Sequence, residues 1–192
     1  MVCKLEGNWT KGLAYDLHTL SSEYLGQDEY GHDRYENKRS EMGELVYQLK
    51  YKNDASTVEK IVDLIQKEVD FSRVDVVVTI PPSNQSRPKQ PVILIATEIG
   101  KRFGVDVYFD ALAKTRGSQE LKKITDPNER LESLKKTMHL TDKYDLSAKV
   151  VLLLDDLYRS GVTLSVATEL LIKTAKAKKV YVLTMTKTRS NR

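Results

Sequence analysis

The sequence of this 192-residue chain predicts an α/β fold, in which an open, mostly parallel sheet is flanked by helices. Short runs rich in Val, Ile and Leu recur along the chain, as in strands that are buried on both faces. Stretches with helical periodicity separate these runs, and no break in composition divides the chain into independent domains. Strands that alternate with helices of this length imply right-handed crossovers and therefore a parallel sheet.

The first 44 residues differ in kind and are predicted to form an irregular arm or hood. They contain Trp9, four tyrosines and five glycines, so we expect aromatic packing to order them. The tyrosines are Tyr15, Tyr24, Tyr30 and Tyr35. Residues 45–192 are predicted to hold the sheet and to form one compact unit with residues 1–44. His18 and His32 have no second ligand at metal spacing, which favours structural roles for both.

The sheet-forming part begins with an amphipathic helix predicted over 56–69, which has its apolar residues on one face. A buried strand over 74–80 follows and ends at proline, since proline cannot donate to a strand ladder. A helix over 91–103 leads through Gly104 into a strand over 105–109.

The second half repeats this alternation. A helix is predicted over 127–138, a strand over 149–154, a helix over 162–176 and a final strand over 179–185. Ligands of parallel sheets bind at the carboxyl ends of the strands. We therefore expect the turns that follow the strands 74–80 and 149–154 to meet at one site.

An acidic pair and a small polar turn follow the strand over 149–154. Asp155 and Asp156 end the apolar run, and the turn opens onto the next helix. The turn consists of Arg159, Ser160, Gly161, Val162 and Thr163. Backbone N–H groups at such a helix N-terminus form an anion cradle that suits phosphate. Carboxylates do not bind phosphate, so their natural partners are sugar hydroxyls or a hydrated Mg²⁺.

These residues resemble the signature of the type I phosphoribosyltransferases, in which apolar strand residues lead to Asp-Asp, two variable residues and Thr-Thr-Gly-x-Thr or a close variant. The resemblance implies that Asp155 and Asp156 hold the ribose hydroxyls of phosphoribosyl pyrophosphate (PRPP), and Mg²⁺ through water and PRPP. It also implies that residues 159–163 wrap the 5′-phosphate. Arg159 stands where the family often has Thr. A strand that ends in a capping Asp is the alternative, but it explains only one of the two acids.

A second turn can supply donors to the pyrophosphate of PRPP. Pro81, Pro82 and Ser83 end the strand over 74–80, and Arg87 follows them. Ser83 Oγ, the Arg87 guanidinium and backbone amides beyond the prolines are suitable donors, with Mg²⁺ bridging the phosphate oxygens. A strand that simply ends at proline, with Arg87 at the surface, explains these residues equally well.

Three segments resemble the ComF-like, competence-associated branch of the family, over about residues 45–188. They are Leu49-Lys50-Tyr51, Pro81-Pro82 through Arg87, and Lys114-Thr115-Arg116-x-x-Gln119 with Glu129-Arg130. The branch usually has Arg-Gly-Phe-Asn-Gln where this chain has Arg87-Pro88-Lys89-Gln90-Pro91, and it often begins with a zinc knuckle that this chain lacks. The molecule that accepts the transferred group can therefore differ from the acceptor of that branch.

The basic residues of 112–126 predict a lid. The resemblance implies that this loop closes over the pyrophosphate, with Lys114 and Arg116 as catalytic residues that stabilise the departing charge. A solvated basic loop is the alternative.

The resemblance implies a Mg²⁺-dependent enzyme that transfers the phosphoribosyl group of PRPP to an unknown acceptor, such as a nucleobase, and releases pyrophosphate. One alternative is a toxin-like enzyme that transfers pyrophosphate from PRPP to an RNA, at a tRNA 3′ end, and is neutralised by a partner protein. Another is a non-catalytic PRPP sensor or DNA-uptake accessory module, associated with DNA-processing proteins.

The composition excludes several other classes. Cys3 is the only cysteine, which excludes a disulfide framework and a four-cysteine zinc site. The net charge of +4 does not by itself predict nucleic-acid binding. The sequence has neither an apolar run long enough for a membrane span nor a signal-peptide core, so we expect a cytoplasmic protein. A homodimer is the usual state of such folds.

Overall fold

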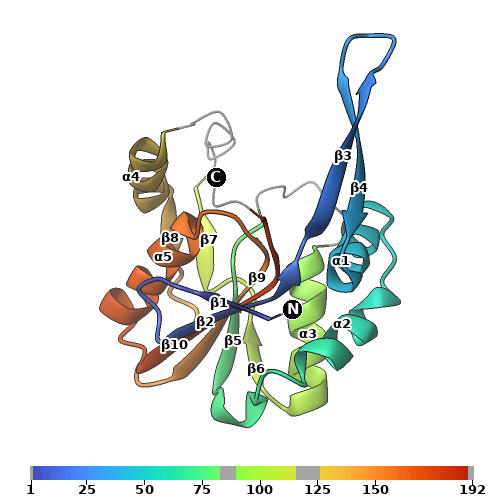
Figure 1. Ribbon diagram of the computed structural model, residues 1–192. Helices are drawn as coiled ribbons and strands as arrows, with labels where there is room; N and C mark the ends of the chain where they lie inside the picture. Colours follow the sequence, from blue (N-terminus) through green and yellow to red (C-terminus); the bar gives the residue numbers. More distant parts are fainter. Residues whose placement is uncertain (1, 83–89, 116–125, 190–192) are drawn as a thin grey trace.

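The computed structural model describes residues 2–82, 90–115 and 126–189 (Figure 1). Its centre is a six-stranded sheet in the order β1-β2-β10-β9-β5-β6. These strands are β1 (Cys3–Leu5), β2 (Lys11–Leu17), β10 (Lys179–Lys187), β9 (Val150–Tyr158), β5 (Val76–Thr79) and β6 (Asp106–Tyr108). Every neighbouring pair is parallel except β1 with β2. The predicted α/β class with a mostly parallel sheet is therefore confirmed.

Helices cover both faces of this sheet (Figure 1). On one face lie α1 (Glu41–Tyr51), α2 (Thr57–Ile65) and α3 (Pro91–Phe103), which share a core with Val77, Leu152 and Leu154. On the other lie α4 (Pro127–Thr137) and α5 (Val162–Glu169), which share a core with Val76, Val151 and Leu153. Successive strand residues thus enter opposite cores, which is why the strands read as continuous apolar runs.

Most element boundaries agree with the sequence. α3 has the predicted bounds, because Pro91 lies in its first turn and Gly104 ends it with a left-handed φ of 66°. The helix predicted over 56–69 ends earlier, and a short 3₁₀ helix η1 (Phe71–Arg73) follows it. The helix predicted over 162–176 continues from α5 into a wider π-helical turn, η3 (Leu170–Thr174).

Strand β9 is longer than predicted, and the acidic pair lies within it rather than after it. β10 pairs with β9 from Lys179–Val150 to Lys187–Tyr158, and this includes Thr184 opposite Asp155. The backbone of the acidic pair is therefore held by its neighbouring strand, whereas β5 ends at Thr79, opposite Leu154. The two acids extend past β5 on a rigid element.

The first 40 residues are more regular than the expected irregular arm. β1 and β2 extend the central sheet, where Leu5 and Ala14 are buried and Trp9 Nε1 donates to the Leu5 carbonyl at 2.9 Å. β3 (Thr19–Gln27) and β4 (Asp33–Arg39) form an antiparallel hairpin that projects from the body (Figure 1). The division of the chain at residue 44 stays a prediction.

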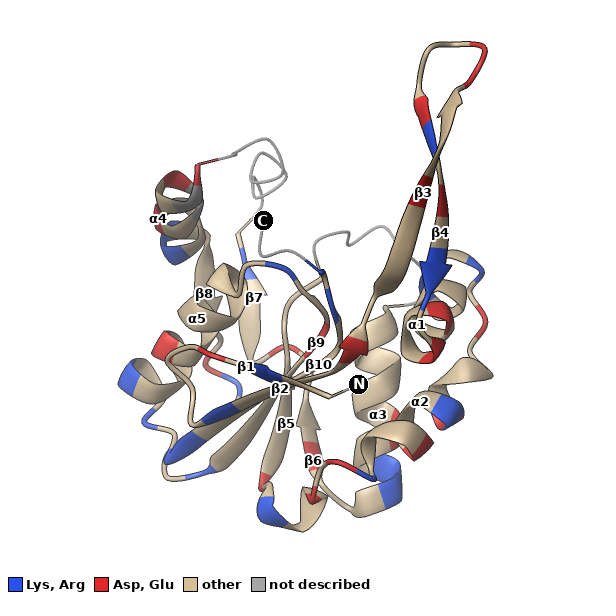
Figure 2. Ribbon diagram, viewed as in Figure 1, with Lys and Arg blue, Asp and Glu red and all other residues tan. Residues whose placement is uncertain are grey.

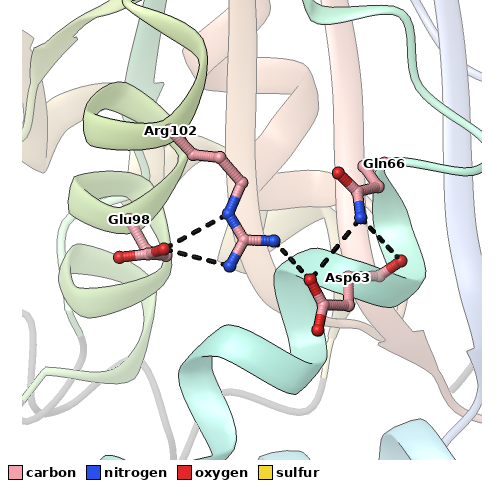
Figure 3. A network of polar contacts seen from close by, with 4 residues as sticks. All are labelled: Asp63, Gln66, Glu98 and Arg102. Atoms are coloured by element: carbon pink, nitrogen blue, oxygen red, sulfur yellow. Dashed lines mark hydrogen bonds and ion pairs between the residues drawn. The ribbon is translucent and has the colours of Figure 1, made fainter.

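Two smaller features complete the described structure. β7 (Leu112–Lys114) and β8 (Met138–Leu140) form an antiparallel pair. Arg102 of α3 binds Glu98 on its own helix and Asp63 of α2, and Gln66 donates to Asp63, so the network links the two helices (Figure 3). In the three described segments, no helix is both long and apolar enough to cross a membrane.

Candidate functional site

Asp155 and Asp156 lie at the carboxyl end of the sheet, beside the turn that follows β5. The Ile80 amide donates to the Leu154 carbonyl at 3.0 Å, so the chain leaves β5 directly next to Asp155. Pro81 is buried and Pro82 is half-buried. The predicted meeting of the proline turn and the acidic pair is therefore present in the described backbone.

Asp155 is half-buried and its carboxyl resists ionisation. Its Oδ1 accepts a hydrogen bond from the Asp156 amide at 2.8 Å. Burial, together with the charge of Asp156, raises the pKa of Asp155 to about 7, although the positive charges of Lys50 and Lys114 act in the opposite direction. At neutral pH, a proton on Asp155 is thus easily lost or gained.

Asp156 forms an ion pair with a residue that lies 106 positions earlier in the chain. The Nζ atom of Lys50, in the last turn of α1, lies 2.6 Å from Asp156 Oδ2. The two side chains are 22% and 15% exposed, respectively, so solvent screens the contact only in part. Lys50 therefore brings a fixed positive charge to the acidic pair.

A short hydrogen-bond chain supports the backbone of Asp156. The buried Thr186 hydroxyl donates to the Asp156 carbonyl at 3.2 Å, and His18 Nδ1 lies 3.2 Å from the same hydroxyl oxygen. Because the Thr186 hydroxyl donates its proton to the Asp156 carbonyl, its oxygen can only accept from His18, so His18 Nδ1 is the donor. Burial lowers the pKa of His18, and the charges of Arg39 and Lys50 lower it further. The expectation that His18 is structural agrees with this position.

The turn after β9 leads directly into the N-terminus of a helix. Gly161 has a left-handed φ of 77° and immediately precedes α5. Arg159 and Ser160 are exposed, whereas Gly161, Val162 and Thr163 are half-buried. The first amides of a helix have no acceptor within that helix, so they are available to an anion.

Lys114 connects the predicted lid to the proline turn. It lies at the end of β7, and its Nζ is 3.4 Å from the Pro81 carbonyl oxygen. Lys114 also lies near enough to Asp155 to lower that residue's pKa. Ser83, Arg87 and Arg116 lie outside the described residues, so their predicted roles are untested.

Two further features bear on where a ligand can bind. Within the described parts of the chain, no three His, Cys, Asp or Glu side chains are close enough to hold a metal ion by themselves. A surface cavity of about 570 Å³ is lined by residues 66–72 and Phe103. It lies where chain segments enter β5 and β6, at the amino end of the sheet, and so it is remote from Asp155.

Comparison with known proteins identifies the fold. No family model and no curated protein matches the sequence. Among solved structures, the chain is similar to the glutamine PRPP amidotransferase from B. subtilis complexed with ADP and GMP, with a TM-score of 0.51 and 18% identity over 82% of this chain and 34% of that chain. This is the fold of the type I phosphoribosyltransferases. The chain spans about a third of the amidotransferase.

Two other structures with the phosphoribosyltransferase fold have lower scores. An adenine phosphoribosyltransferase from Thermoanaerobacter pseudethanolicus has a TM-score of 0.44 and 11% identity over 86% of this chain and 95% of that chain. A Trypanosoma cruzi hypoxanthine phosphoribosyl transferase has a TM-score of 0.42 and 14% identity over 79% of this chain and 68% of that chain. The ComF-like resemblance stays a prediction.

Within this phosphoribosyltransferase fold, sequence reasoning missed three contributors to the acidic pair's surroundings. Lys50 was part of a resembling segment, but nothing pointed to its contact with Asp156. Thr186 lies just past the end of the predicted final strand, and His18 was predicted only as an isolated structural histidine. Each lies far from Asp155 in the sequence, so no local spacing could have revealed them.

Proposed function

We propose that the protein is a Mg²⁺-dependent enzyme that binds PRPP and transfers its phosphoribosyl group to an acceptor, with pyrophosphate as the leaving group. The observation that supports this most directly is the arrangement at the end of β9. Two acids on a rigid strand are followed, after four intervening residues, by Gly161 and a helix N-terminus. This arrangement occurs in a chain with the phosphoribosyltransferase fold.

The acidic pair is suited to the ribose. Ionised Asp155 and Asp156 accept hydrogen bonds from the 2′ and 3′ hydroxyls and so orient the sugar. As the bond between C1 and the pyrophosphate oxygen breaks, positive charge develops on the ribose ring. The nearby carboxylates stabilise this charge more in the transition state than in the ground state, which is what lowers the barrier.

The turn of residues 159–163 is suited to the 5′-phosphate. Its backbone amides and the helix dipole of α5 provide positive potential without a charged side chain. Gly161 allows the chain to turn sharply between β9 and α5. The phosphate is thereby anchored at a fixed distance from the acids that hold the ribose.

The pyrophosphate would lie on the other side of the acids, near the proline turn. Lys114 already contacts the Pro81 carbonyl and supplies a positive charge there. We assign Ser83, Arg87 and Arg116 to the same group by their sequence positions. Cations beside the leaving group stabilise its developing negative charge.

The oxygen donors of the acidic pair fit Mg²⁺, which prefers carboxylate, phosphate and water oxygens. Two acids alone do not complete a metal site, so Asp155 and Asp156 would hold the ion through water and PRPP. Bound Mg²⁺ would neutralise charge on the leaving pyrophosphate. The protein's own contribution is to position the ribose and exclude alternative orientations of it.

The β3–β4 hairpin is our candidate for contacts with the acceptor. It begins directly after His18, and the Arg189 guanidinium donates to the Leu20 carbonyl at 2.9 Å, so its base adjoins the carboxyl end of the sheet. By contrast, lysines gather at the amino-terminal ends of β9 and β10 (Figure 2). That group, Lys149, Lys176, Lys178 and Lys179, is at the opposite end and plays no part in the proposed transfer.

The decisive experiment uses PRPP labelled separately on its ribose and on its β-phosphate, with Mg²⁺, the full chain, nucleobases and total small RNA. Ribose label on an acceptor, with free labelled pyrophosphate, is the expected result. β-Phosphate label on RNA without ribose label would replace our proposal with pyrophosphate transfer. Saturable PRPP binding in which neither label moves would replace it with a sensor.

A further inference from the structure

Lys50 brings a positive charge to Asp155 and Asp156, the acids at which we propose that PRPP and Mg²⁺ bind. Its Nζ lies 2.6 Å from Asp156 Oδ2, and both side chains are largely covered. Within the described part of the chain, Oδ2 is the carboxylate oxygen of Asp156 that has a hydrogen-bond partner. The other oxygen, Oδ1, can therefore serve a ligand while Lys50 stays in place.

The position of Lys50 is set by the packing of the whole helix. Met42, Val46 and Leu49 of α1 are almost completely buried against the sheet. At this depth, α1 cannot move away from β2 and β10 without exposing its apolar face. The ammonium group is therefore delivered to Asp156 by a rigid element, rather than by a mobile surface chain.

The start of α1 is fixed to the strand that precedes the hairpin. Ser40 Oγ accepts the Gly43 amide at 3.0 Å, as a helix N-cap, and also donates to the Leu17 carbonyl. A Cβ atom at Gly43 would lie 2.2 Å from the His18 carbonyl oxygen, so only glycine permits this approach. Both ends of α1 are thus joined to the surroundings of the acidic pair.

The charge of Lys50 changes what the acidic pair can attract. Two adjacent ionised carboxylates carry two negative charges and would attract a divalent cation directly. Lys50 offsets one of these charges, Lys114 lies near enough to Asp155 to offset them further, and within the described residues no third acid or histidine completes a metal site. A bare cation then gains little from binding at the pair.

We propose that Lys50 is a built-in counter-cation that prevents bare divalent cations from binding at Asp155 and Asp156, so that the metal enters only together with PRPP. The proposal rests on the proposed function, since it concerns the same site. Lys50 acts through Asp156 and is a positioning residue, because it need not contact the ribose itself. PRPP supplies phosphate oxygens that the acidic pair lacks, and these make the metal's binding favourable.

The test is direct binding of Mn²⁺, used as a paramagnetic stand-in for Mg²⁺, to the full chain without PRPP. Free Mn²⁺ is followed by its electron paramagnetic resonance signal at pH 8. The variants are Lys50→Met and Lys50→Gln, which remove the charge but keep much of the side-chain stem. The exposed Lys52, at the end of the same helix, provides the matched control Lys52→Gln with the same change in net charge.

Wild type, Lys52→Gln and Lys50→Arg are expected to bind Mn²⁺ weakly, whereas Lys50→Met and Lys50→Gln bind it at least about tenfold more tightly. Equal Mn²⁺ affinity in wild type and in a folded Lys50→Met protein would overturn the proposal. An equal gain in Lys52→Gln would also overturn it, because net charge alone would then explain the effect. Lys50→Arg keeps the charge and provides a folded comparison if the neutral variants unfold.

A separate titration with PRPP keeps the two proposals distinguishable. If wild type binds no PRPP in the presence of Mn²⁺, the proposed function fails, whatever the metal affinity of the Lys50 variants. If wild type binds PRPP with Mn²⁺ but also binds Mn²⁺ alone as tightly as Lys50→Met does, the proposed function survives and the role of Lys50 fails.

Discussion

Gly161 lies against the ring of Tyr158, and a Cβ atom added to the glycine would be only 2.7 Å from the tyrosine hydroxyl oxygen. Tyr158 is the last residue of β9 and is buried. The Tyr158 ring therefore packs against Gly161, in the turn of residues 159–163 that we propose binds the 5′-phosphate. This contact and the left-handed φ of Gly161 act together to require glycine at the position.

Gly161→Ala should lower the free energy of unfolding by about 2–4 kcal/mol, because it adds a close contact to the strain of a left-handed alanine. It should also weaken PRPP binding severely, since the turn must shift. Urea unfolding and PRPP titration measure the two effects.

Gly104 provides the control for this substitution. It also has a left-handed φ, of 66°, but nothing lies within 4 Å of an added Cβ atom. Gly104→Ala should therefore cost only about 1 kcal/mol and leave PRPP binding unchanged. Equal losses of stability in Gly161→Ala and Gly104→Ala would show that the close contact with Tyr158 does not destabilise the Gly161→Ala protein.

Asp155 makes stability depend on pH in an unusual direction for a carboxylate. Because its pKa is raised to about 7 in the folded protein, the folded state holds a proton that the unfolded state releases near pH 4. The stability from the protonated group is fully present below about pH 4, and it is lost as pH rises through about 7. Above that pH, the folded protein carries the full cost of the buried charge.

Asp155→Asn should therefore be more stable than wild type at pH 8, by about 1–3 kcal/mol, and nearly equal to it at pH 4. It should nevertheless lose transfer activity, since an amide cannot replace the carboxylate. Urea unfolding across this pH range measures the first effect. The exposed Asp142, changed to Asn, should give a profile parallel to wild type. A parallel profile for Asp155→Asn would contradict the assigned pKa.

Asp156→Asn should reduce phosphoribosyl transfer by about 100-fold or more while the protein stays folded, because it removes a charge that faces the ribose in the proposed site. Initial rates with saturating Mg²⁺ and PRPP, together with circular dichroism, measure both quantities. Arg102→Gln, in the network between α2 and α3, serves as a remote control that should keep full activity. A folded Asp156→Asn protein with normal turnover would refute the proposed role.

Thr186→Val should lower the free energy of unfolding by about 1–3 kcal/mol, because it leaves the His18 donor without its acceptor and the Asp156 carbonyl without its donor. Thr186→Ser keeps the hydroxyl and should cost less. Thermal unfolding of both variants distinguishes them. If valine is tolerated as well as serine, the hydrogen-bond chain contributes nothing to stability.

Much of the fold was predictable because its signals are local. The apolar run before Asp155 identified β9, and the bounds of α3 followed from Pro91 and Gly104. The Gly161 turn was equally visible, since glycine between a strand and a helical pattern indicates a loop that opens onto a helix N-terminus. Each of these features is determined by a few neighbouring residues, so the local sequence is enough to predict it.

The rest depends on contacts between distant residues. Tyr181 of β10 pairs in parallel with Lys11 of β2, and Lys50 forms an ion pair with Asp156. In neither pair does the sequence around one residue indicate which distant residue it will contact. The end of β9 was placed too early because Asp155 and Asp156 read as a loop, whereas β10 holds them in the sheet. Charge pairs and strand order arise only when the chain is folded.

The β3–β4 hairpin is tied to the rest of the protein mainly at its base. Its two strands pair only with each other in the described structure, and most of their side chains are exposed, including Tyr24 and Tyr35, as is Tyr30 in the turn between them. Few core contacts therefore constrain the hairpin's length or sequence. Substitutions in the hairpin should therefore cost little stability, so the acceptor contacts that we propose for it can change while the sheet and its acidic pair stay the same.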